Sequence, residues 1–129
     1  MPNWMLDSIA LIDYYHGRAA VIPYFEAILV GQAAGAFSTI TELELWQGLR
    51  PGEEERHEAL LALLERVPLD GPIARRAGQL RQQVGLDRLS LPDAAIAASA
   101  ELTGYTLLTR NTRDFGLLQA LLPIEFYEP

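Results

Sequence analysis

Two hydrophobic patterns alternate along the chain. Short apolar runs, which are typical of buried strands, are followed by longer segments in which apolar residues recur at helical spacing. The short runs predict strands over residues 4–6, 36–40, 67–69, 105–109 and 124–127. The helical spacing predicts helices over residues 8–15, 20–34, 41–49, 53–66, 72–84 and 90–103. Because strands alternate with helices, we expect an α/β fold with three α/β/α layers, in which a central parallel sheet is flanked by helices.

Glycine and proline set several of the predicted boundaries. Gly35 is expected to end the second helix, and Pro51-Gly52 is expected to break the third. Gly104 follows the last predicted helix, which is a common place for glycine. The alternation continues without an internal repeat or a linker, so we expect one domain that spans residues 1–129.

Composition narrows the classes of function. The chain has 129 residues, a formal net charge of −7 and no cysteine. The negative charge argues against charge-driven binding to nucleic acid or to an anionic membrane, but it is compatible with an enzyme that meets nucleic acid through cations. The lack of cysteine excludes a thiolate metal site. Because the sequence shows no signal peptide and no apolar run of about 18 residues, we expect a cytoplasmic protein without a membrane segment.

Acidic residues follow the predicted strands. Asp7 follows the first strand, Glu44 lies one helical turn after the second, and Asp114 follows the strand over 105–109. The carboxyl ends of parallel strands meet at one edge of a sheet, where such folds bind ligands, so we expect these acids to lie close together. Asp93 begins a helix, and it joins them if that helix starts at the same edge.

Such a cluster favours a metal-dependent reaction. Neighbouring carboxylates raise one another's pKa unless a cation neutralises them. Oxygen ligands without nearby histidine or cysteine favour Mg²⁺ or Mn²⁺ over Zn²⁺. Magnesium commonly meets phosphate, and a bound metal lowers the pKa of a water that can then attack a phosphodiester. The cluster therefore predicts phosphodiester hydrolysis.

Each acid also has a structural alternative. Asp7 is a suitable helix cap, and Asp114 could cap the turn that follows it. Glu44 completes a Thr41-x-x-Glu44 capping box. Asp93 fits the first turn of a helix that Ser90 caps. From the residues alone, four separate caps remain an alternative to one shared site.

Three blocks of the sequence resemble the PIN-domain family, in particular its VapC-like toxin ribonucleases. "MLDSIALIDYYHG" is similar to the family's opening block, and "STITELELWQG" is similar to its second. "LSLPDAAIAASAELTGYTLLTRNTRDF" is similar to its third block nearly throughout. The resemblance implies a parallel sheet between helices and a Mg²⁺- or Mn²⁺-dependent endoribonuclease. It also implies an RNA substrate, a homodimer and a cognate antitoxin protein.

The resemblance also assigns site residues. Asp7, Glu44 and Asp93 match the family's metal-site acids, and the fourth acid falls at Asn111 or Asp114, of which only Asp114 is a carboxylate. We expect Asp7 and Asp93 to ligate a first metal, with Asp114 and Glu44 completing the site or holding a second metal. The family usually has asparagine two positions after its first aspartate, where this chain has Ile9, which cannot orient a carboxylate or a water.

Several other residues are candidates for supporting roles. Arg110 and Arg113 flank the predicted site and could contact RNA phosphate, or they could be solvated loop charges. Thr109 is a weaker candidate for a site hydroxyl. The remaining polar and aromatic candidates are expected on the surface or in packing contacts. Surface positions are expected for His16, His57, Arg75, Arg76 and Arg81, and packing rather than base stacking for Tyr14, Tyr15 and Trp46.

Three rival functions compete with a ribonuclease. Ile9 lends weight to a non-catalytic binding module with the same fold. A DNA nuclease is also compatible, because metal chemistry does not by itself read the 2′-hydroxyl. A Mg²⁺ phosphatase or phosphotransferase ranks lower, since that class generally has a second aspartate at position 9 and a lysine, and the chain has neither.

Overall fold

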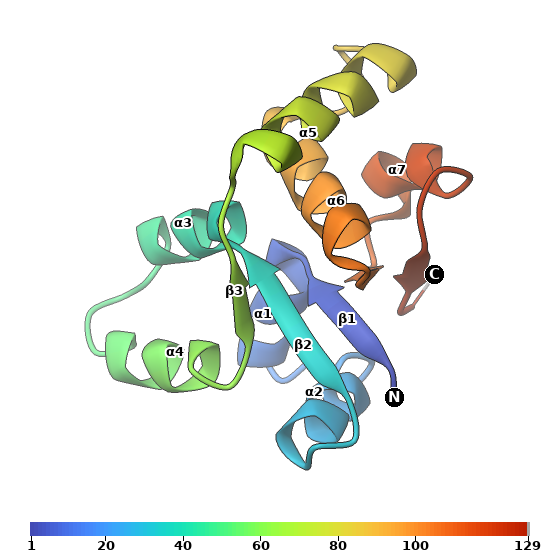
Figure 1. The fold of residues 1–129 in the computed structure, drawn as a ribbon. Helices are drawn as coiled ribbons and strands as arrows, with labels where there is room; N and C mark the ends of the chain where they lie inside the picture. Colours follow the sequence, from blue (N-terminus) through green and yellow to red (C-terminus); the bar gives the residue numbers. More distant parts are fainter. Residues whose placement is uncertain (129) are drawn as a thin grey trace.

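A central sheet of five parallel strands organises the protein (Figure 1). The structure is a computed structural model, and it describes residues 1–128. The strands lie in the order β3-β2-β1-β4-β5 and pair in parallel throughout. Their bounds are β1 Asn3–Leu6, β2 Ala34–Ser38, β3 Glu65–Val67, β4 Thr106–Thr109 and β5 Ile124–Phe126. Met5 at the centre pairs with Ala36 on one side and Leu107 on the other.

Helices cover both faces of this sheet, which confirms the three-layer α/β/α architecture. The helices are α1 Ser8–Tyr15, α2 Ile22–Leu29, α3 Thr39–Gln47, α4 Glu54–Leu61, α5 Gly71–Val84, α6 Leu91–Thr103 and α7 Thr112–Phe115, with a 3₁₀ turn over Gly116–Leu118. Met5 and Leu107 pack with α5, α6 and α7 on one face. Leu6 and Leu108, the next residue along each strand, pack with α1, α2 and α4 on the other. In Figure 1, α5 runs beside α6, and α1 lies behind the sheet.

The second predicted helix is too long. Helix α2 ends at Leu29, and β2 begins at Ala34, so Gly35 lies inside a strand and does not end a helix. A Cβ atom on Gly35 would lie 2.7 Å from Ile28 Cδ1 and 2.8 Å from Leu64 Cδ2. Glycine at position 35 lets the ends of two apolar side chains pack directly on the backbone of β2, and a larger residue there would displace them.

The predicted helix over 53–66 is also too long, and the strand after it was predicted too late. Helix α4 ends at Leu61, and β3 runs over Glu65–Val67 rather than 67–69. Leu64 is buried against the sheet from the turn between them. Its apolar character therefore continued the helical pattern past the true end of the helix. The short helix α7 was not predicted, because four residues are too few to show a period.

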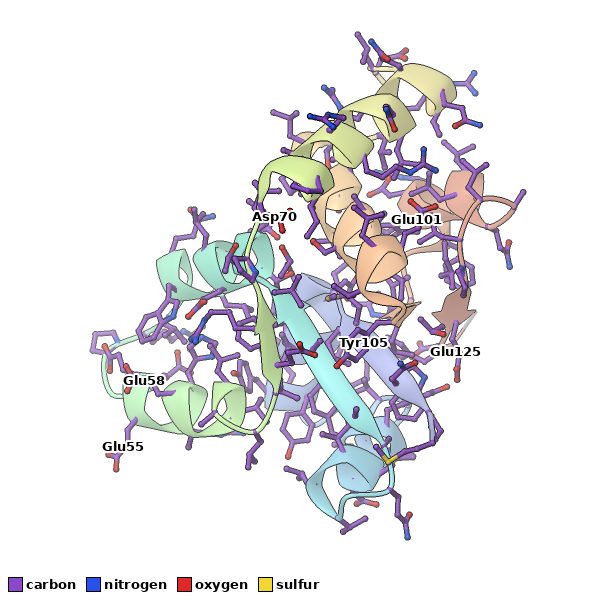
Figure 2. The ribbon with its side chains drawn as sticks, viewed as in Figure 1. Glu55, Glu58, Asp70, Glu101, Tyr105 and Glu125 are labelled. Atoms are coloured by element: carbon purple, nitrogen blue, oxygen red, sulfur yellow. The ribbon has the colours of Figure 1, made fainter. Side chains whose placement is uncertain are left out.

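Several predicted surface residues make specific contacts. His57 is buried on the inner side of α4, so its predicted surface position is wrong. Arg76 pairs with Glu101 of α6, with 2.5 Å between Nε and Oε1. Glu101 is labelled on α6 in Figure 2. Arg81 donates hydrogen bonds of 2.7 Å to the carbonyls of both Leu86 and Leu89. Arg76 therefore connects α5 to α6, and Arg81 connects α5 to the segment that follows it.

The aromatic residues near α1 pack as expected. The ring of Tyr14 stacks on Phe25, with centroids 4.1 Å apart and planes 8° from parallel.

None of the helices formed by residues 1–128 has both the length and the hydropathy that crossing a membrane requires.

Candidate active site

A cleft of about 300 Å³ opens beyond the carboxyl ends of β1 and β4. All four predicted acids line it, and they come from the starts of α1 and α6, from α3 and from the short helix α7 that follows β4. The lining residues are Asp7, Ser8, Ile9, Glu44, Ser90, Pro92, Asp93, Ile96, Asn111, Asp114 and Phe115. The position of Asp93 in this cleft shows that α6 does begin at the same edge as the strand ends.

Asp7 is both a helix cap and a member of the cleft. Its Oδ1 accepts a hydrogen bond of 2.7 Å from the Ala10 amide, and its Oδ2 accepts one of 2.5 Å from Thr109 Oγ1. The side chain is buried, and burial raises the pKa of Asp7 to about 7 against the lowering effect of these two hydrogen bonds. The charge of Asp93 raises this pKa further. A cation in the cleft would favour the ionised form.

Glu44 does not form the predicted capping box. The cap of α3 is Ser38, whose Oγ accepts a hydrogen bond of 3.1 Å from the Ile40 amide, so Thr41 lies inside the helix. The Glu44 carboxylate is free of capping and accepts a hydrogen bond of 2.6 Å from Ser8 Oγ. Ser8 was not among the predicted site residues, although it directly follows Asp7. Its contact ties α1 to α3 across the cleft.

Asp93 lies in the first turn of α6, as predicted. Ser90 caps this helix, and its Oγ accepts a hydrogen bond of 3.2 Å from the Asp93 amide. Burial raises the pKa of Asp93, and the charges of Asp114 and Glu44 raise it further against the lowering effect of Ser90. The carboxylates of the cleft are therefore close enough to oppose one another's ionisation.

Asn111, not Asp114, caps the helix after β4. Asn111 Oδ1 accepts a hydrogen bond of 3.1 Å from the Asp114 amide. Asn111 Nδ2 in turn donates a bond of 2.8 Å to Asp114 Oδ2. The asparagine thus orients the carboxylate, and both side chains line the cleft.

The three weaker candidates lie behind the cleft or at its rim. Thr109 is buried, and its Oγ1 donates to Asp7 and accepts a hydrogen bond of 3.0 Å from the Asn111 amide. Arg110 turns away from the cleft, and its Nε lies 2.6 Å from Asp13 Oδ2. Arg113 is 92% exposed and lies 3.5 Å from Asp114 Oδ1.

Asp13 anchors the segment after β4, through Arg110, and it was not among the predicted site residues. Besides Arg110, it accepts a hydrogen bond of 2.7 Å from the Tyr127 hydroxyl. Burial would raise the pKa of Asp13, but the hydrogen bonds from Arg110 and Tyr127 outweigh it and hold the pKa below its ordinary value. The available signal was an acid within the apolar segment "ALIDYY".

The cleft fits a hard divalent cation in donor type and charge. Its polar lining consists of carboxylates, hydroxyls and one amide, without histidine or cysteine. Among residues 1–128, no three histidine, cysteine, aspartate or glutamate side chains already converge on one ion position. Protein donors occupy both oxygens of Asp7 and one oxygen each of Glu44 and Asp114. The second oxygens of Glu44 and Asp114 accept no hydrogen bond from residues 1–128 and are free to ligate a metal while their partners hold the carboxylates in place.

Comparisons with known proteins agree with this architecture. The PIN domain family model matches residues 4–119. Ribonuclease VapC10 of Mycobacterium tuberculosis is 31% identical over 123 residues, which cover 92% of this chain and 90% of that protein. Ribonuclease VapC19 of the same organism is 29% identical over 122 residues, covering 92% of this chain and 97% of the relative.

Solved structures show the same fold. A toxin-antitoxin complex from Klebsiella pneumoniae contains a chain with a TM-score of 0.75 and 34% identity, and the match covers 89% of this chain and 90% of that one. A chain of DNA-bound VapBC from Salmonella typhimurium has a TM-score of 0.79 at 24% identity, over 98% and 99% of the two chains. Family model, relatives and fold all match over most of the sequence, and the chain therefore belongs to the PIN domain family.

Proposed function

We propose that this protein is a Mg²⁺- or Mn²⁺-dependent endoribonuclease and the toxin of a toxin–antitoxin pair. The observation that carries the proposal is the gathering of Asp7, Glu44, Asp93 and Asp114 in one cleft. These acids come from separate parts of the chain, and local capping accounts neither for Glu44 nor for Asp114. Similarity to proteins named ribonuclease VapC supports RNA as the substrate.

The proposed metal ligands are Asp7, Asp93 and Asp114, with Glu44 completing the site or holding a second ion. When bound, the metal would lower the pKa of a water and offset the negative charge of the phosphodiester. The raised pKa values of Asp7 and Asp93 support this assignment, because both carboxylates lie where a cation would stabilise their ionised forms.

The rest of the cleft would position these acids. Thr109 and Ser8 hold Asp7 and Glu44 through their hydroxyls, and Asn111 holds Asp114. Ile96 and Phe115 supply apolar walls, which exclude bulk water from the inner side of the carboxylates.

The proposal extends to partners. Matching solved structures include a toxin-antitoxin complex, which supports a cognate antitoxin for this chain. We further propose that the protein is a cytoplasmic homodimer whose one domain carries the complete acidic cluster.

Ile9 favours one second candidate, a non-catalytic binding module. This side chain lines the cleft beside Asp7 and brings no polar atom to it. In that case the four acids would bind a ligand in the cleft but would not catalyse its cleavage.

RNA cleavage by two matched variants tests the proposal. The wild type should cleave single-stranded RNA with Mg²⁺ or Mn²⁺. Asp93→Asn should lower kcat/KM by more than about 100-fold, since losing even an outer partner of a metal ligand commonly costs 10–100-fold. Asp87→Asn changes an exposed acid outside the cleft and should cleave like the wild type. Equal rates for the two variants would remove Asp93 from the site, and a wild type inactive with both metals would favour the binding module.

A further inference from the structure

Three consecutive side chains at the end of β4 each hold a different aspartate. In chain order, the pairs are Thr109 with Asp7, Arg110 with Asp13, and Asn111 with Asp114. The first and last of these aspartates are proposed metal ligands and line the cleft. Asp13 lies outside the lining that residues 1–128 form, so the middle pair has no part in the chemistry proposed above.

Asp13 is a buried acid in an unfavourable place for a negative charge. It lies in the last turn of α1, where the helix dipole is negative, and only 4% of its surface is exposed. A buried ion pair is often worth no more to stability than apolar side chains of similar volume. Stability alone therefore does not account for an acid at this position, whereas a role in fixing geometry does.

Three separate parts of the chain meet at the Asp13 carboxylate. Arg110 Nε lies 2.6 Å from Asp13 Oδ2, and the Tyr127 hydroxyl donates a hydrogen bond of 2.7 Å to the same oxygen. Tyr127 is buried, and its backbone amide donates a hydrogen bond of 3.2 Å to the Thr109 carbonyl. The carboxylate therefore joins α1 to the residues that follow β4 and β5.

Helix α1 is attached to the end of β4 at two points. Asp7 caps the start of the helix and accepts its hydrogen bond of 2.5 Å from Thr109 Oγ1. Asp13, near the end of the same helix, binds Arg110, which is the next residue of the chain after Thr109. Two contacts along one helix fix the direction of the attached segment as well as its position, which a single contact cannot do.

This double attachment sets the place of the next acid in the chain. The Asn111 amide donates a hydrogen bond of 3.0 Å to Thr109 Oγ1, and Asn111 then caps helix α7, which carries Asp114. Asp114 can therefore move relative to Asp7 only if this series of contacts changes. The ligands of a metal site must keep their distances to within about 0.2 Å, so a small movement would matter.

We propose that Arg110 is a positioning residue for the metal site, and that Asp13 and Tyr127 hold it in place. Arg110 sets the place of Asp114 relative to Asp7, and it contacts neither the metal nor the RNA. The inference rests on the proposed function and adds to it residues outside the cleft on which metal affinity depends.

Calorimetric titration with Mn²⁺ measures the effect on the metal site. Arg110→Gln should weaken Mn²⁺ binding about tenfold, the low end of the range for losing an outer partner of a metal ligand. Loss of a positive charge near the cleft would by itself strengthen the binding of a cation, so weaker binding reports a change of position. Arg110→Lys keeps the cation and should recover most of the affinity, because only one of the two contacts with Asp13 is short, at 2.6 Å against 3.4 Å.

Two further variants separate position from charge and from stability. Tyr127→Phe removes a hydroxyl donor without changing any charge, and it should weaken Mn²⁺ binding less than Arg110→Gln does, because the ion pair remains. Arg76→Gln breaks the 2.5 Å ion pair with Glu101 on the opposite face of the sheet and should bind Mn²⁺ as the wild type does. Equal losses in Arg76→Gln and Arg110→Gln would show a general effect of stability and overturn the positioning role.

Hydrogen exchange in the metal-free protein reports on the positioned segment itself. The Asp114 amide donates a hydrogen bond of 3.1 Å to Asn111 Oδ1, and NMR can follow its exchange with solvent. This exchange should become several-fold faster in Arg110→Gln, because the segment opens more readily, and it should stay unchanged in Arg76→Gln. Unchanged exchange in Arg110→Gln would contradict the proposal without reference to any metal.

RNA cleavage distinguishes a displaced metal site from an unstable protein. In Arg110→Gln the Mn²⁺ concentration at half-maximal rate should rise about tenfold, and saturating Mn²⁺ should restore most of the rate. A protein that is only less stable would lose rate at every Mn²⁺ concentration and keep the same midpoint.

The outcomes separate this inference from the proposed function. If the wild type binds Mn²⁺ but cleaves no RNA, the ribonuclease is wrong, and weaker Mn²⁺ binding by Arg110→Gln would still support the positioning role. If the wild type cleaves RNA and Arg110→Gln binds Mn²⁺ as tightly or more tightly, the positioning role is wrong and the ribonuclease stands. A wild type that binds no Mn²⁺ would overturn both.

Discussion

Thr109 donates a 2.5 Å hydrogen bond to Asp7 in the interior of the protein. The same hydroxyl accepts a hydrogen bond from the Asn111 amide, so one side chain joins the end of β1 to the cap of helix α7, which carries Asp114. Because burial raises the pKa of Asp7 and this bond lowers it, the hydroxyl helps to keep the carboxylate ionisable.

Replacing Thr109 with valine should therefore weaken metal binding. Thr109→Val keeps the shape of the side chain but leaves Asp7 Oδ2 without its donor. We expect Mn²⁺ affinity to fall about 10–100-fold, the usual effect of losing a partner of a metal ligand. Calorimetric titration measures this change. Thr109→Ser retains the hydroxyl and should bind Mn²⁺ nearly as the wild type does, and a Thr109→Val protein with unchanged affinity would contradict the assignment.

Asp13 should stabilise the protein in a pH-dependent manner. Its folded-state pKa is held below the ordinary value of 3.8, so its contribution is complete above about pH 4 and is lost as the pH falls through the folded-state pKa. Asp13→Asn should lower the free energy of unfolding at pH 7 by about 2 kcal/mol. This is less than the 3–5 kcal/mol typical of breaking a buried ion pair, since Arg110 retains contact with water.

Urea denaturation of the wild type and Asp13→Asn across pH 2–7 measures this difference. The gap between the two proteins should stay constant down to about pH 4 and shrink below it. A gap that widens in acid would reverse the sign and contradict the ion pair with Arg110.

Ile9 should limit activity. Ile9→Asn places an amide in the cleft beside Asp7, at the position where the resembling family has asparagine. We expect its RNA cleavage to exceed that of the wild type several-fold, because the amide can orient a carboxylate or a water. Ile9→Val is the apolar control and should cleave at the wild-type rate. Equal rates for the asparagine and valine variants would show that the wild-type isoleucine does not restrict the reaction.

Gly35→Ala should destabilise the fold. The added Cβ would lie 2.7 Å from Ile28 Cδ1 and 2.8 Å from Leu64 Cδ2. Because the ends of these side chains can move aside, we expect a cost of about 1 kcal/mol, the low end for overpacking. Gly78→Ala is the matched control, since Gly78 is exposed on helix α5 and no neighbouring atom lies within 4 Å of the added Cβ. Gly78→Ala should stabilise the protein by about 0.5–1 kcal/mol. Thermal denaturation compares them, and equal stability of both variants would contradict the close packing on β2.

The sequence predicted the gathering of the acids because parallel strands bring separate segments to one edge. Helix ends were less predictable, since Leu64 continues a helical pattern although it packs from a turn. The cap of α3 was misplaced at Thr41, because Ser38 ends a strand and caps a helix at once. The ion pair between Asp13 and Arg110 joins residues 97 positions apart, and no local pattern encodes such a partner.

The central claim is that the four acids share a cation, and Mn²⁺ titration by calorimetry tests it most directly. The wild type should bind Mn²⁺ at or below about millimolar concentration, and Asp93→Asn and Glu44→Gln should each weaken binding at least about tenfold. Asp87→Asn, outside the cleft, should bind as the wild type does. Binding by the wild type that both cleft variants retain in full, or no binding at millimolar Mn²⁺, would contradict a shared metal site.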